Sequence, residues 1–119
     1  MTALFVVPTV TVHRRCEVLR AQVVGSWRVE GGRFAGTMVE FTSSGLLLYV
    51  DQWSTVWTGT YNVGGARTLH FRDDGGAEAA TITVEVVNEE ELVCVNNRPA
   101  GRFRGVSGRL RRVTPGSGE

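Results

Sequence analysis

Few side chains in this chain could act as a nucleophile or a general base, and those that could lie far apart. The histidines are His13 and His70. His70 stands between two apolar residues of an alternating segment, which turns its side chain to solvent. His13 lies among arginines, and no serine, histidine and aspartate form a defensible catalytic triad. We therefore expect that the protein is not an enzyme and has no catalytic residue.

The two cysteines give no better case for a metal or a cofactor. Cys16 and Cys94 are too far apart for a Cys-x-x-Cys site, and the sequence clusters no further ligands around them. We predict no metal site and no cofactor. The pair could form one disulfide or remain as two buried thiols, and the sequence leaves both interpretations open.

Aromatic side chains offer a different chemistry, which is contact with a small apolar ligand. Six of them are candidates for lining a cavity: Phe41, Tyr49, Trp53, Trp57, Tyr61 and Phe71. In so small a domain the same rings could fill the core instead, and both interpretations stay open. Trp53 follows Asp51 and Gln52 in a predicted turn, so we expect it to be exposed. An exposed tryptophan indicates a contact surface for a ligand or a partner protein.

The charges are balanced overall but uneven along the chain. Thirteen basic residues, all arginine, stand against twelve acidic ones, and the net charge of +1 argues against binding to nucleic acid or a membrane surface. Acidic residues gather in 73–91 and arginines in 98–112. We expect the two segments to pair across the protein surface. The alternative is an anion or acidic-partner patch made by Arg102, Arg104, Arg109 and Arg111.

The elements that hold these residues are mostly strands. Nineteen valines and twelve threonines favour strands, and fifteen glycines supply tight turns. Eight segments are predicted to be strands, most of them with apolar residues at every second position: Ser26–Glu30, Thr37–Thr42, the apolar run Leu46–Val50, Thr55–Val63, a strand with Leu69 and Phe71, Ala80–Val86, Leu92–Val95 and Arg102–Val113. In the last of these, a long basic strand, a bend at Gly105 or Gly108 stays open. The period of two predicts an all-β protein, an up-and-down antiparallel barrel of about eight strands.

Residues 1–24 and 114–119 fall outside this pattern. Apolar residues at helical spacing predict one short helix, His13–Val24, which we expect to cap the barrel of residues 25–113. Residues 114–119 are expected to be a flexible tail. The apolar run Met1–Val12 is too short to span a bilayer and lacks the features of a signal peptide. We favour the interpretation that this run is a strand retained in the mature protein. For the location of the protein, we therefore favour the cytoplasm over secretion or the periplasm. An atypical signal, an extra strand and an interface all stay open.

Several short motifs occur in an order that suggests a family. They are Gly25-Ser26-Trp27, Glu40-Phe41-Thr42-Ser43-Ser44-Gly45-Leu46, Gly59-Thr60-Tyr61-Asn62-Val63, Thr81-Ile82-Thr83-Val84 and Leu110-Arg111-Arg112-Val113. Together they resemble the small bacterial lipocalin-like domains of the calycin superfamily. The resemblance implies a helix before the Gly-x-Trp strand and an arginine of the last strand packed over that tryptophan. Alternation puts Arg112 on the inner face with Leu110, so we assign this closing role to Arg112 and Trp27.

Two functions are compatible with these expectations. The first is a lipocalin-like binding module that holds a small apolar ligand in the barrel. The second is a protein-interaction or inhibitor module with a filled barrel, acting through its loops and its N-terminal segment. Some small calycins inhibit proteases through their N-termini, so the resemblance implies an inhibitor role for the N-terminal segment under the second function. The oligomeric state and the identity of a ligand or partner are not fixed by the sequence.

Overall fold

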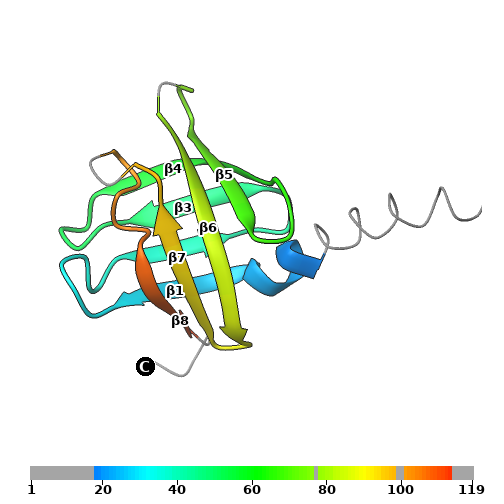
Figure 1. The fold of residues 1–119 in the computed structure, drawn as a ribbon. Helices are drawn as coiled ribbons and strands as arrows, with labels where there is room; N and C mark the ends of the chain where they lie inside the picture. The colour runs from blue at the N-terminus through cyan, green and yellow to red at the C-terminus, as the bar shows by residue number, and fades with distance from the viewer. Residues whose placement is uncertain (1–17, 77, 99–100, 114–119) are drawn as a thin grey trace, which may run out of the picture.

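A computed structural model describes residues 18–76, 78–98 and 101–113, and these form a closed barrel of eight antiparallel strands (Figure 1). The strands are β1 (Gly25–Glu30), β2 (Met38–Phe41), β3 (Leu46–Val50), β4 (Val56–Val63), β5 (Thr68–Asp73), β6 (Ala79–Asn88), β7 (Glu91–Asn96) and β8 (Gly108–Val113). Each strand pairs with the next, and β8 pairs with β1 to close the ladder. The predicted fold class, an up-and-down antiparallel barrel, is confirmed.

Alternation along the strands separates a buried interior from an outer wall. In β6, Ala80, Ile82 and Val84 are buried, whereas Thr83 and Glu85 are exposed. Because successive side chains of a strand point to opposite faces, every strand contributes one row to the core and one to the wall. The core therefore lies inside the barrel and draws on all eight strands.

One short helix, residues 18–23, packs at one end of the barrel (Figure 1). Leu19 and Val23 are buried against the core, one helical turn apart. The helix was predicted over His13–Val24, and Val24 lies beyond its end. Residues 13–17, the run Met1–Val12 and the tail 114–119 lie outside the described residues.

The prediction of one long final strand, Arg102–Val113, was wrong in its first half. β8 begins only at Gly108, and the residues before it form successive turns. The amide of Arg104 bonds to Gly101 O at 3.1 Å, and that of Val106 bonds to Phe103 O at 2.9 Å. These local bonds replace a strand ladder, and Gly108, with φ of 90°, then turns the chain into β8.

The barrel has two ends, which differ in the elements that they carry. The helix end carries helix 18–23 and the turns after β2, β4 and β6. The loop end carries the connections after β1, β3, β5 and β7. Since each strand crosses the barrel once, consecutive turns alternate between the two ends (Figure 1).

Candidate functional site

Four of the six predicted cavity residues lie inside the barrel in contact with one another or with a fifth ring. The Phe41 ring centroid is 5.0 Å from that of Tyr61 and 5.7 Å from that of Phe71. Phe103 adds a ring 5.5 Å from Phe71 and 6.1 Å from Tyr49. All five side chains are buried. Edge-to-face and tilted contacts at these distances are those of a packed aromatic core.

Phe103 was missed because its segment alternates like a strand, although it lies in the β7–β8 loop. The loop folds over the barrel and buries both Phe103 and Val106. Asn96 Nδ2 donates to Phe103 O at 2.8 Å, and Gly105 N donates to the Tyr49 hydroxyl at 3.1 Å. A Cβ on Gly105 would lie 2.3 Å from that hydroxyl, so this close approach needs glycine. The loop end is thus covered by side chains and backbone of one loop.

Trp57 lies at the same end, half-buried beneath Arg102. The Arg102 guanidinium carbon is 4.5 Å from the Trp57 ring centroid. The Arg102 guanidinium also donates to and pairs with the carboxylate of Asp73, whose side chain is only 4% exposed. Its backbone N donates to Glu78 Oε1 at 3.0 Å. This arginine joins the β7–β8 loop to β4, to β5 and to the connection between β5 and β6.

Trp27 and Arg112 meet at the helix end. The Arg112 guanidinium carbon is 4.3 Å from the Trp27 ring centroid. Arg112 donates from Nη1 to Val24 O and from Nη2 to Gln22 O, both at 2.9 Å. Its Nε donates to Glu89 O at 2.8 Å. One side chain therefore joins β8 to the helix, to the residue that follows it and to the β6–β7 turn.

Gly25 makes room for this arginine. A Cβ at Gly25 would lie 2.5 Å from Arg112 Nη1, and its φ of 130° is a conformation that other residues rarely adopt. The glycine of the Gly-Ser-Trp motif is thus required both by its backbone and by the guanidinium beside it.

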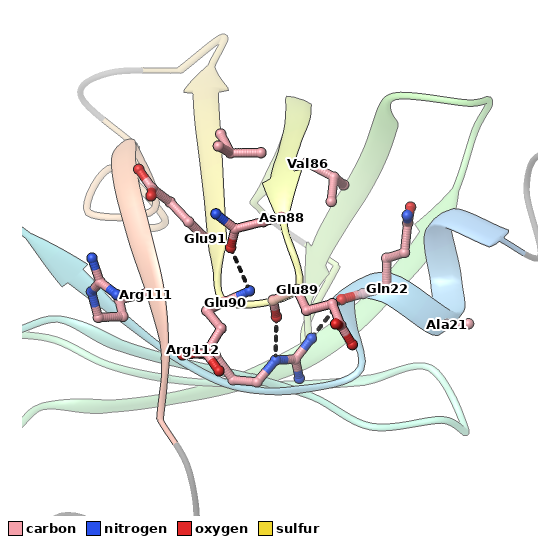
Figure 2. Close-up of a pocket in the computed structure, with 10 residues that line it drawn as sticks. Ala21, Gln22, Val86, Asn88, Glu89, Glu90, Glu91, Arg111 and Arg112 are labelled. Atoms are coloured by element: carbon pink, nitrogen blue, oxygen red, sulfur yellow. Dashed lines mark hydrogen bonds between the residues drawn. The ribbon is translucent and has the colours of Figure 1, made fainter.

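An open groove of about 930 Å³ lies at the helix end, beside this arginine (Figure 2). Its lining comes from the helix, from β6, β7 and the turn between them, and from β8. It consists of Ala21, Gln22, Val86, Val87, Asn88, Glu89, Glu90, Glu91, Arg111 and Arg112. Asn88 Oδ1 accepts from Glu90 N at 2.8 Å, so part of the polar lining is already bonded. The groove carries charges of both signs, unlike the apolar cavity predicted from the sequence.

Trp53 is the one predicted cavity residue that lies fully outside the barrel. It is 64% exposed on the turn between β3 and β4. Asp51 Oδ1 accepts hydrogen bonds from the amides of both Trp53 and Thr55, each at 2.9 Å. Ser54 adopts a φ of 68°, as such a tight turn requires. The tryptophan is thus presented to solvent from a turn that is internally hydrogen-bonded.

A smaller hollow of about 230 Å³ lies on the outer wall over β1, β2 and β3. It is lined by Ser26, Met38, Val39, Glu40, Leu48 and Val50. Leu46 and Val56 stand on the same outer face and are 55% and 57% exposed. We call Met38, Leu46, Leu48, Val50 and Val56 the outer apolar strip.

Three of the four arginines named as a candidate anion patch are paired with acidic residues. Arg109 Nε is 2.7 Å from Glu91 Oε2, and Arg111 Nε is 3.1 Å from Glu30 Oε1. Arg102 pairs with Asp73, as described above. Arg104 Nη1 donates to Gly101 O at 3.4 Å. Arg109 and Arg102 pair with the acidic segment 73–91 as expected, whereas Arg111 pairs with Glu30 of β1, outside that segment. The exposed pair of Arg111 with Glu30 contributes little to stability.

The remaining reactive groups do not converge. Burial raises the pKa of the Cys94 thiol to about 12, so it is protonated at neutral pH. His70 is exposed, and its Nδ1 lies 3.3 Å from Thr81 Oγ1. Among the described residues, no group of three His, Cys, Asp or Glu side chains is placed to hold a metal ion. His13 and Cys16 lie outside those residues.

Comparison of the chain with protein-family models, curated proteins and solved structures found no match. Within the part of the chain that the structure describes, no helix combines the length and apolar character needed to cross a membrane.

Proposed function

We propose that this protein is a non-enzymatic protein-interaction module of lipocalin-like architecture, in which a filled barrel presents Trp53 to a partner protein. The observation that carries the proposal is a large aromatic side chain, 64% exposed, on a turn held by its own hydrogen bonds. The lipocalin-like assignment rests on the motif order, on the barrel and on the arginine over the Gly-x-Trp tryptophan.

The filled interior supports an outward-facing function. Five aromatic rings contact one another through the barrel, and Phe103 occupies the loop end of that row. A ligand pocket needs about 300 Å³ or more of free space. The interior of this barrel is instead occupied by rings at packing distance, which makes it a scaffold.

The rigid turn supports a role in protein recognition. Tryptophan is enriched among the residues that dominate binding at protein interfaces, where truncation costs about 2 kcal/mol or more. A side chain on a pre-ordered turn loses little conformational entropy on binding. The two hydrogen bonds to Asp51 give Trp53 this advantage before any partner arrives.

A second function, binding of a small apolar ligand in the barrel, stays a prediction. One observation favours it: Phe103 belongs to a loop rather than to a strand. Withdrawal of this ring would leave Tyr49 and Phe71 as the walls of an apolar site. The ligand would then have to replace the contacts that Phe103 makes.

Native mass spectrometry of protein purified from its own host tests the proposal. We expect the wild-type protein to carry a partner protein that Trp53→Ala loses and that Gln52→Ala, the neighbouring exposed position, retains. Equal partner content in the two variants would remove Trp53 from the interface. A carried small molecule in place of a protein would favour the ligand function and overturn the proposal.

A further inference from the structure

We infer that the outer apolar strip on β2, β3 and β4 is a self-association surface, which binds the same strip of a second copy of this chain. This inference does not depend on the role proposed for Trp53. It rests on three observations: the scarcity of charge on this wall, a hollow among its apolar side chains, and a pair of opposite charges beside it.

The wall formed by β3 and β4 is almost free of charge. Between Phe41 and Ala66, Asp51 is the only charged residue, and its carboxylate is engaged by turn amides. The outward side chains of β3 are Leu46, Leu48 and Val50, which are exposed or half-buried. A contiguous exposed apolar surface of this kind is typical of a protein contact.

The cross-strand register joins these side chains into one surface. Met38 lies opposite Val50, and Val50 lies opposite Val56 on the next strand. Leu48 lies beside Glu40. Cross-strand neighbours have Cβ atoms about 5 Å apart, so the strip is continuous across three strands. The hollow of about 230 Å³ lies among them and can receive an apolar side chain.

The opposite wall shows what this barrel surface looks like when solvent covers it. On β7 and β8, Glu91 pairs with Arg109, and Arg111 pairs with Glu30 of β1. Ion pairs thus lie on that side, and its exposed valine, Val95, lies opposite Thr83, whereas the apolar side chains of the strip adjoin one another. The difference identifies β2, β3 and β4 as the wall that a partner covers.

Charge complementarity indicates that the partner is a second copy. Arg28 lies opposite Met38, and Glu40 lies opposite Ser26, so the two charges are diagonal neighbours on the outer wall. Both side chains are exposed, and within the described residues neither forms an ion pair. A two-fold axis that passes between them places Arg28 of each copy against Glu40 of the other. Such an isologous contact needs one patch that carries both charges.

The closed ladder determines the form of the contact. Because β1 pairs with β8, the barrel offers no free strand edge to which another strand could add. A second copy therefore cannot add as a further strand, and its contact must be made through side chains. The outer apolar strip is suited to that geometry.

Sedimentation of the purified full chain tests the inference with two matched valine substitutions. Val56 and Val95 are 57% and 62% exposed, and they lie on β4 and β7. We expect a wild-type dimer at tens of micromolar. Val56→Arg should raise the dimer dissociation constant at least about tenfold, since it places a charge in an apolar contact, whereas Val95→Arg should leave it unchanged.

A charge exchange identifies the two-fold contact. Arg28→Glu and Glu40→Arg should each weaken the dimer, and the double variant should restore it. Trp53→Ala should still form the dimer, so failure of the proposed function and failure of this inference can be told apart. Two results would overturn the inference. One is a wild-type protein that remains monomeric at about 100 μM, and the other is an equal effect of Val56→Arg and Val95→Arg on the dissociation constant.

Discussion

The two ends of the barrel are closed by the same pair of residue types in two different settings. At the helix end, Arg112 lies over Trp27 at 4.3 Å, and at the loop end, Arg102 lies over Trp57 at 4.5 Å. Arg112 gives its hydrogen bonds to three backbone carbonyls. Arg102 instead pairs with Asp73, a buried carboxylate.

The two guanidinium groups are thus positioned over their rings by different partners, neutral carbonyls for Arg112 and a carboxylate for Arg102. Backbone carbonyls are neutral, so removal of Arg112 leaves unpaired dipoles that water can reach in part. Removal of Arg102 leaves the buried charge of Asp73 without its partner, which is far more costly. The two closures therefore look alike but should respond differently to the same substitution.

The largest effect is expected for Arg102→Ala. The uncompensated Asp73 carboxylate should lower the free energy of unfolding by about 3–5 kcal/mol. Urea denaturation followed by tryptophan fluorescence measures this. Arg98→Ala is the control, because its contact with Glu78 is longer, at 3.6 Å, and more exposed. Equal losses in the two variants would show that Asp73 is not held by Arg102.

Arg112→Ala should destabilise less than Arg102→Ala, by about 2–3 kcal/mol, through the loss of the carbonyl bonds and the indole contact. Arg111→Ala changes the neighbouring outward position and should have the same melting temperature as the wild-type protein, because the pair of Arg111 with Glu30 is exposed. Thermal denaturation of the three proteins tests the order. Coincident curves for Arg112→Ala and Arg111→Ala would contradict it.

The ends can also be compared through two tyrosine hydroxyls. Tyr49 accepts from Gly105 N at 3.1 Å at the loop end, and Tyr61 donates to Thr42 O at 2.6 Å near the helix end. Tyr49→Phe leaves a buried N–H unpaired and should cost about 1–3 kcal/mol. Tyr61→Phe leaves a half-buried carbonyl and should cost about 0.5–1.5 kcal/mol. A larger loss for Tyr61→Phe would reverse the comparison.

The smallest effect near neutral pH is expected at Cys94. Burial raises the pKa of this thiol to about 12, above its ordinary value near 9.0. The protonated, buried thiol therefore makes its full contribution to the free energy of unfolding below pH 9. That contribution is lost as the pH rises from 9 toward 12, because the unfolded chain releases the proton first. At pH 8 the thiol should resist alkylation in the wild-type protein, as peptide mass spectrometry can record. Arg102→Ala should accelerate the reaction more than Arg112→Ala if the loop end opens first.

Local alternation was enough to predict the barrel but not its closure at the loop end. Buried residues recur with a period of two along the strands, although β3 is apolar on both faces. Alternation in 108–113 also puts Arg112 on the inner face, where its guanidinium lies. The sequence Arg102-Phe103-Arg104 alternates as well, but the bonds that this segment and Gly105 form with Asn96, Tyr49 and Glu78 join it to other elements. Contacts of that kind leave no local pattern, so Phe103 and the pair of Arg102 with Trp57 were missed.

The pairing of the first strand with the last has a consequence for how the protein is made. Arg112 bonds to Gln22 across 90 positions of the chain, and at about 5–20 residues per second these two are synthesised roughly 5 to 20 s apart. Until β8 is made, Trp27 has no arginine above it and β1 has no second neighbour. The nascent chain must therefore wait with open strand edges and exposed aromatic rings. The barrel can therefore close only after β8 has been synthesised.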